Sequence, residues 1–144
     1  MGLFSRFSTP EIGVEELDVL IQNGAVRVLD VREDWEFSRG RVAGAVNIPL
    51  KKLPVRATQL KHDKPYAVIC ESGSRSRSAT NFLFGEGFEG AVSVKGGTSA
   101  WARTKRPLVR AWSWQQISAD STGTNGTRAA ISKATARTRR SSRA

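Results

Sequence analysis

Apolar positions in the first half of the chain follow two spacings, one typical of helices and one typical of strands. VEELDVLIQNG, residues 14–24, repeats its apolar side chains at helical spacing and ends at Asn-Gly, which predicts a helix that begins after Gly13. AVRVLDV, residues 25–31, predicts a short strand, followed by a charged turn with the sequence REDWEF. A second strand, GAVNIP, is expected to end at Pro49.

The second half of the chain repeats this alternation. PYAVIC, residues 65–70, is almost entirely apolar, as expected of a central parallel strand that helices cover on both faces. A helix is predicted at 76–88, a fourth strand at 90–94, and a turn with a short helix at 96–107. Strands that alternate with helices predict an α/β fold, a three-layer α/β/α sandwich with a mainly parallel central sheet. Ligands of such sheets bind beyond the carboxyl ends of the strands, and Cys70 ends one of them.

The length of 144 residues suits one domain of ordinary size. We expect an N-terminal extension at 1–10, a folded domain at 11–114 and a tail at 115–144. Within the tail, residues 118–144 are rich in Ser, Thr, Gly, Ala and Arg, and their only large aliphatic residue is Ile131. Such a segment buries too little apolar surface to offset the entropy of ordering it, so we expect a basic, disordered tail.

The formal net charge of +10 raises the question of a nucleic-acid partner. Half of the excess lies in the tail, where six basic residues face one acidic residue. Because the tail has no aromatic side chains to stack on bases, we expect any nucleic-acid contact by it to be weak and salt-dependent.

The chain shows neither the continuous apolar region of a secretory signal nor the roughly 20 apolar residues of a membrane span. One cysteine cannot form an internal disulfide, which fits a reducing compartment. We therefore expect a cytoplasmic protein without membrane contact. With one cysteine and one histidine, His62, we expect neither a metal site nor a cofactor.

The cysteine opens a loop with the sequence CESGSRS, which is composed mostly of small residues. Gly73 and its neighbouring serines let the backbone curl, so that several N–H groups can point at one centre. The positive end of the following helix adds to this field. A free cysteine is only a few per cent thiolate at neutral pH, and the thiolate is the nucleophile. A loop that lowers the pKa of the thiol therefore makes the sulfur more nucleophilic. We expect Cys70 to be a catalytic nucleophile rather than a packing residue.

The length of the loop discriminates between two chemistries. Cysteine phosphatases use a C-x5-R loop, whereas here four residues separate Cys70 from Arg75 and the C-x5 position is Ser76. The ring is one residue short for phosphate, and no second cysteine exists for the disulfide relay of an arsenate reductase. Both activities are therefore disfavoured.

The sequence resembles a single-domain rhodanese from about Gly13 to Val109. The resemblance rests on VLDVREDWEFSRGRVAGAVNIPL at 28–50, CESGSRS at 70–76 and VKGGTSAW at 94–101. It implies a rhodanese fold and a sulfurtransferase that uses no cofactor. A small-molecule donor, thiosulfate or a persulfide, gives its sulfur to Cys70, and a thiol or cyanide removes it. A protein could also serve as the sulfur acceptor.

The resemblance also implies roles for individual residues. Cys70 becomes the nucleophile and persulfide carrier, and Asp30 and Arg32 support the pocket. The active-site loop comprises Glu71, Ser72, Gly73, Ser74, Arg75 and Ser76. Gly96 and Gly97 match the turn before the tryptophan helix.

The chain departs from the family pattern at Glu71, where relatives often carry a basic residue, and at Arg41, where a histidine is usual. A carboxylate at the mouth of the pocket should repel the thiosulfate dianion. A rhodanese-like binding or regulatory module with little catalysis is therefore the alternative function.

Several polar and aromatic side chains have structural interpretations. Asp30 and Arg32 could form only an ion pair that organises loops. Trp35 and Trp101 are expected to pack, with pocket lining as the alternative. His62 is expected to be exposed and without a role.

Overall fold

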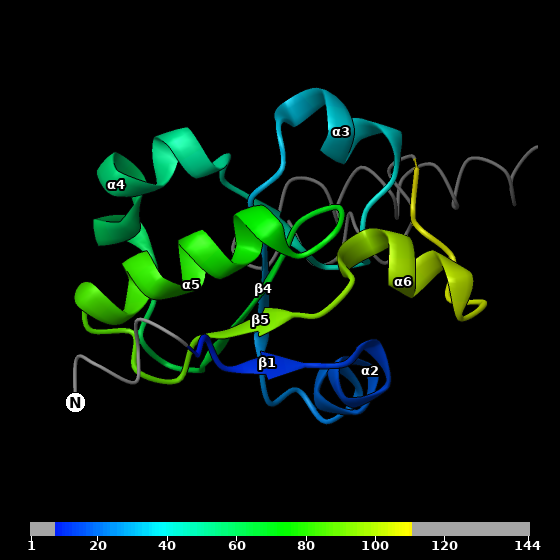
Figure 1. The fold of residues 1–144 in the computed structure, drawn as a ribbon, viewed down its shortest axis with the longest axis horizontal. Coiled ribbons are helices and arrows are strands. Elements are labelled where there is room, and N and C mark those ends of the chain that lie inside the picture. Colours follow the sequence, from blue (N-terminus) through cyan, green and yellow to red (C-terminus); the bar gives the residue numbers. More distant parts are fainter. Residues whose placement is uncertain (1–7, 111–144) are drawn as a thin grey trace, which may run out of the picture. The chain divides into compact units, whose positions relative to one another are not determined.

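The computed structural model describes residues 8–110, and the predictions for 1–7 and 111–144, including the basic tail, lie outside the described residues. The described part contains a five-stranded sheet in the order β1-β5-β4-β2-β3, with every pair of neighbouring strands parallel (Figure 1). The strands are β1 (Glu11–Ile12), β2 (Arg27–Asp30), β3 (Val46–Asn47), β4 (Tyr66–Ile69) and β5 (Val92–Val94).

Helices cover both faces of this sheet, which confirms the predicted three-layer α/β fold. They are α2 (Val14–Gln22), α3 (Asp34–Arg39), α4 (Leu53–Arg56), α5 (Ser74–Gly85) and α6 (Gly97–Arg103), with short 3₁₀ turns at Leu50–Lys52 and Ala57–Gln59. One apolar cluster joins the sheet to α4 and α5, and a second joins it to α2 and α6. Burial of large side chains in these clusters stabilises the fold by about 1.5–3 kcal/mol each.

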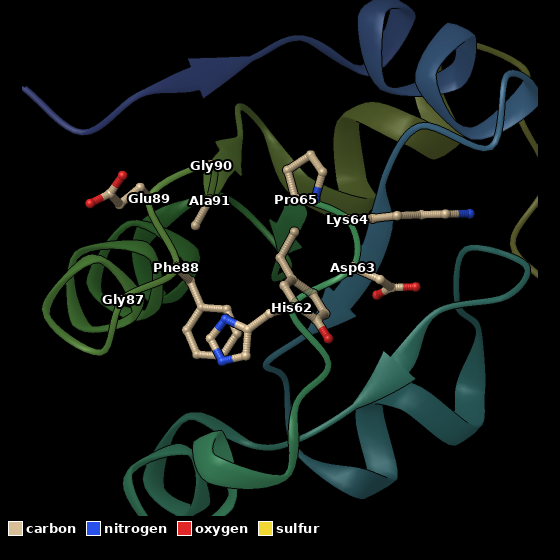
Figure 2. Close-up of a pocket in the computed structure, with 10 residues that line it drawn as sticks. His62, Asp63, Lys64, Pro65, Gly87, Phe88, Glu89, Gly90 and Ala91 are labelled. Atoms are coloured by element: carbon tan, nitrogen blue, oxygen red, sulfur yellow. The ribbon is translucent and has the colours of Figure 1, made fainter.

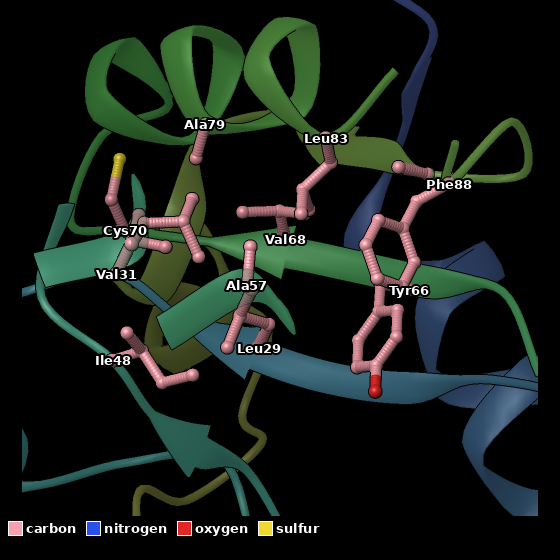
Figure 3. Packing of buried hydrophobic residues seen from close by; sticks show 12 residues of the cluster. Leu29, Val31, Ile48, Ala57, Tyr66, Val68, Cys70, Ala79, Leu83 and Phe88 are labelled. Atoms are coloured by element: carbon pink, nitrogen blue, oxygen red, sulfur yellow. The ribbon is translucent and has the colours of Figure 1, made fainter. Parts of the chain in front are cut away.

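Strand β4 supplies both clusters through its alternating side chains. Tyr66 and Val68 belong to the α4/α5 cluster, whereas Ala67 and Ile69 belong to the other. Cys70 continues the first face, and Figure 3 shows its side chain in line with Val68 beneath α5. The fold thus buries Cys70 to 1 % exposure at the carboxyl end of the central strand.

The structure corrects two expectations in the segment after β2. Residues 34–39, predicted as part of a charged turn, form α3, and none of its residues is buried. A capping box stabilises this short helix, because the side chains of Glu33 and Glu36 each accept a backbone N–H. Trp35 on α3 is 61 % exposed, so the packing prediction was wrong for Trp35, whereas Trp101 is 7 % exposed and packs as expected.

Two further boundaries differ from the sequence prediction. Strand β4 ends at Ile69, so that Cys70 is the first residue after the strand rather than its last. Helix α5 begins at Ser74, two residues earlier than predicted, because Gly73 adopts a left-handed conformation (φ 111°) and serves as its N-cap.

Candidate active site

The sulfur of Cys70 faces two backbone N–H groups of the loop that follows β4. The amide of Gly73 donates to Sγ over 3.1 Å, and the amide of Ser76 donates over 3.3 Å. Both donors belong to the segment that the sequence predicts as the active-site loop. This arrangement favours an anion at the position of the sulfur.

The local sequence explains why these amides are available. The first N–H groups of a helix have no partner within it, and Ser76 lies in the first turn of α5. The left-handed conformation of Gly73 turns the chain sharply enough to bring this turn back over Cys70. The positive end of the helix dipole is therefore directed at the sulfur.

A pair of buried hydroxyls extends the polar contacts of the sulfur. The Ser76 Oγ lies 3.6 Å from Sγ and donates to the Gly73 carbonyl over 3.0 Å. It shares a second hydrogen bond, of 2.7 Å, with the Ser93 Oγ of β5. Both serines are fully buried. Sequence reasoning missed Ser93, although a small polar residue within the apolar run GAVSV was a signal.

Arg75 is held by a carboxylate from α3. Its Nη1 and Nη2 donate to the two carboxylate oxygens of Glu36 over 2.6 and 2.9 Å. This hydrogen-bonded guanidinium lowers the pKa of Glu36 to about 2, against the opposing effect of partial burial. The same carboxylate raises the pKa of Arg75. The sequence did not single out Glu36, which lies 39 positions before its partner.

Asp30 and Arg32 form a buried ion pair beside the loop. The Arg32 Nε donates to both carboxylate oxygens of Asp30 over 3.0 Å, and Nη2 donates to Oδ2 over 2.8 Å. The same Nη2 reaches the carbonyl of Gly40 over 2.6 Å. The pair therefore braces the segment that follows β2.

Backbone hydrogen bonds from the first turn of α6 also hold the cysteine loop in place. The N–H groups of Thr98 and Ser99 donate to the carbonyls of Cys70 and Glu71 over 2.8 and 3.1 Å. Gly97 lies so close that a Cβ on it would collide with both carbonyl oxygens, and its φ is +60°. Only glycine fits this position, which gives the predicted glycine turn a direct contact with the loop.

A shallow pocket of about 240 Å³ lies beside the loop. Glu71, the residue after the cysteine, lines it together with Glu36, Arg32 and Arg39. Ala102 and Leu108 give it an apolar wall. The exposed Ser72 and Ser74 lie on the surface of the loop itself.

A second hollow lies at the other end of β4 and has no part in the cysteine loop. Figure 2 shows that it is bordered by residues 62–66 and 87–91, where the exposed His62 ring stacks on Phe88 with ring centroids 4.1 Å apart. Among the described residues 8–110, no group of three or more His, Cys, Asp or Glu side chains could hold a metal ion. Within the same range, no helix is long and apolar enough to cross a bilayer.

This arrangement of a cysteine loop on a parallel sheet matches a known family. The family model of the rhodanese-like domain matches residues 13–104, so the chain belongs to the rhodanese-like family. The cysteine loop, with both of its amide donors, lies inside the matched region.

Relatives of known class agree with this assignment. The chain is 31 % identical over 94 residues to a thiosulfate sulfurtransferase of Shewanella oneidensis, covering 65 % of this chain and 93 % of that protein. It is also 31 % identical over 84 residues to a sulfurtransferase of Allochromatium vinosum, covering 58 % of this chain and 78 % of the relative. Among solved structures, a rhodanese-related protein of Thermoplasma volcanium superposes with a TM-score of 0.66 at 38 % identity, over 71 % of this chain and 99 % of that one.

Proposed function

We propose that this protein is a sulfurtransferase in which Cys70 carries a sulfane sulfur from a donor, thiosulfate or a persulfide, to a thiophilic acceptor. The observation that supports this proposal best is the pair of amide donors, from Gly73 and Ser76, directed at Sγ. Sulfurtransferases among the relatives support the same reaction class.

The reaction consists of two displacements at sulfur. The Cys70 thiolate attacks the outer sulfur of the donor, a new S–S bond forms, and the donor's own sulfur bond breaks. The leaving group is sulfite when the donor is thiosulfate, and the thiolate R–S⁻ when the donor is a persulfide R–S–SH. In the second step a thiolate or cyanide attacks the outer sulfur of the Cys70 persulfide. The bond between that sulfur and Sγ breaks, Cys70 is released as its thiolate, and the acceptor becomes a new persulfide or thiocyanate. Both steps return electron pairs to sulfur, so no external oxidant or reductant takes part.

The surrounding residues have distinct roles in this scheme. The Gly73 and Ser76 amides stabilise the negative charge on sulfur before and after transfer. Glu36 holds Arg75 in place beside the loop, and the buried pair of Asp30 and Arg32 keeps the neighbouring segment in position. The pair of Arg75 and Glu36 thereby connects the loop to α3, which we interpret as a positioning role.

Persulfide formation tests the proposal directly. We expect incubation of the folded, reduced protein with a sulfur donor to add the mass of one sulfur atom to Cys70. Cys70→Ser should abolish turnover with cyanide by at least about 10³-fold while leaving the melting temperature within a few degrees, because the substitution removes the nucleophile with little change of volume. Turnover by Cys70→Ser equal to that of the wild type would contradict the proposal.

A binding module with little catalysis is the second candidate, favoured by the 1 % exposure of Cys70. Alkylation separates the two functions. A carrier should react with iodoacetamide in the folded state as well as with sulfur donors. A module should react only after unfolding in urea, and no donor should add sulfur to it.

A further inference from the structure

Arg75 of the cysteine loop and Arg32 after β2 are each paired with a carboxylate. Arg75 donates to both oxygens of Glu36, and Arg32 uses Nε and Nη2 on Asp30. The Arg32 Nη1 reaches the carbonyl of Glu36 over 3.3 Å. Both guanidinium groups therefore already carry carboxylate partners within hydrogen-bond distance.

The lining of the 240 Å³ pocket is balanced in the same way. Its charged side chains are two arginines, Arg32 and Arg39, and two glutamates, Glu36 and Glu71. Arg39 lies over the exposed Trp35 ring, with its guanidinium 5.3 Å from the ring centroid. The pocket thus has no net charge, although the whole chain carries +10.

Glu71 is the acidic residue with the clearest effect on an incoming donor. It is exposed, it follows Cys70 directly, and it lines the pocket. The pKa of Arg75 is raised chiefly by Glu36, and the negative charge of Glu71 adds a small further increase. A donor that enters through the pocket beside the loop meets this negative charge. Because Arg32 and Arg75 already carry carboxylate partners, Glu71 repels a doubly charged donor more strongly than a singly charged one.

The remaining wall of the pocket is apolar and suits an organic group. Ala102 and Leu108 face the same space as Glu71. A carbon skeleton can bury surface against them, whereas the sulfonate oxygens of thiosulfate cannot. Charge and shape therefore favour the same kind of donor.

From this arrangement we infer that Glu71 sets the donor preference of Cys70 toward small organic persulfides and against the thiosulfate dianion. The inference rests on the proposed function, because it names the substrate class of the same site. An alkyl persulfide carries at most one negative charge on its reacting sulfur, whereas thiosulfate carries two charges on a compact group. The outer sulfur moves to Cys70 in both cases, and the leaving group is a thiolate instead of sulfite.

Paired rate measurements test the inference. The second-order rate constants for adding sulfur to Cys70 are measured by mass spectrometry with cysteine persulfide and with thiosulfate. We expect the wild type to favour cysteine persulfide by at least about tenfold, Glu71→Gln to shift the ratio about fivefold toward thiosulfate, and Glu71→Lys to shift it roughly 20-fold. Added salt should narrow the difference between these variants.

Glu89→Gln is the matched control, since Glu89 is an exposed carboxylate that lines the hollow at the other end of β4. The same charge change there should leave the ratio unchanged. Equal rates for both donors, a preference for thiosulfate, or a ratio unaffected by the Glu71 substitutions would each overturn the inference and leave the sulfur carrier intact. Failure of both donors with a folded, reduced protein would instead contradict the proposed function.

Discussion

At the amino-terminal end of β4, a hollow is enclosed by side chains, with the His62 ring stacked on Phe88 and Tyr66 packed edge-on against the same phenyl ring. At the carboxyl end of the same strand, the sulfur of Cys70 is enclosed by backbone amides instead. The hollow, of about 310 Å³, is larger than the pocket of about 240 Å³ beside the cysteine loop. The lining of the hollow contains no cysteine, whereas the smaller pocket lies beside the loop of Cys70, our proposed nucleophile, whose sulfur accepts from two amides.

A partly exposed bidentate ion pair lies near each end of the strand, so the exposed fractions of the two pairs can be compared. Arg27 donates to Asp63 over 2.8 and 2.6 Å at the amino-terminal end, and Arg75 donates to Glu36 over 2.6 and 2.9 Å at the other. The Asp63 side chain is 47 % exposed and that of Glu36 only 12 %. The two ion pairs should therefore contribute differently to stability despite their similar geometry, because water screens the more exposed pair of Arg27 and Asp63 more strongly.

The largest expected effect is on stability at the amino-terminal end. Phe88→Ala removes a phenyl ring that is 7 % exposed from the α4/α5 cluster, and we expect the free energy of unfolding to fall by about 3–5 kcal/mol. Urea denaturation measures the loss. The exposed His62 supplies the control, since His62→Ala should cost less than about 1.5 kcal/mol. A large loss of donor reactivity per folded molecule in Phe88→Ala would show that the two ends are coupled.

The next effect falls on the cysteine loop. Gly97→Ala places a Cβ against the carbonyl oxygens of Cys70 and Glu71 and strains a positive φ, so the loop must shift. We expect the rate of sulfur addition to Cys70, followed by mass spectrometry, to fall by about 100-fold. Small displacements of the loop amides from the sulfur slow the reaction strongly.

Gly87→Ala is the matched control for this substitution. Gly87 also has a positive φ, of +93°, but nothing lies within 4 Å of an added Cβ, and it borders the hollow at the other end. Its strain should cost about 1–2 kcal/mol of stability without slowing sulfur addition. Equal loss of reactivity in both variants would assign the effect to general destabilisation.

The smallest expected effect is on the stability of the protein at low pH. Because the pKa of Glu36 is lowered to about 2 in the folded protein, its contribution to stability is present above the ordinary value near 4.5 and is lost as the pH falls toward 2. We expect the melting temperature of Glu36→Gln to fall less steeply than that of the wild type between pH 5 and pH 2, by a few degrees. Thermal melts at several pH values measure this slope.

The ion pair at the other end of β4 sharpens the same measurement. The pKa of Asp63 is also lowered to about 2, chiefly by the Arg27 hydrogen bond, but this pair is more exposed. Added salt should reduce the stability difference between the wild type and Asp63→Asn more than the stability difference between the wild type and Glu36→Gln. A greater salt sensitivity of the Glu36 pair would contradict the difference in burial.

Much of the fold could be predicted from the sequence because its signals are local. Alternation of helical and strand spacing gave the parallel sheet, and the uninterrupted apolar run at 65–70 gave its central strand. The two-residue strand β1 was missed, since only its pairing with β5 makes it a strand. Helix α3 was read as a turn because it has no buried face and its charged residues follow no apolar period.

The candidate site was predictable where it depends on the loop's own sequence. The roles of Cys70 and Gly73 could be predicted, because Cys70 lies at the end of an apolar strand and Gly73 suits a tight turn. Those of Glu36 and Ser93 could not, because these residues reach the site from α3 and β5, respectively 39 positions before Arg75 and 17 positions after Ser76. Such partners are set by tertiary packing, which spacing along the chain does not encode.

The near-complete burial of the only cysteine also bears on which sulfur of a persulfide an acceptor can reach. An added sulfur atom would extend from a side chain that is itself 1 % exposed, and the amides of Gly73 and Ser76 cover Sγ. Under the proposed function, attack is therefore directed to the outer sulfur, which returns Cys70 unchanged, and not to the inner one.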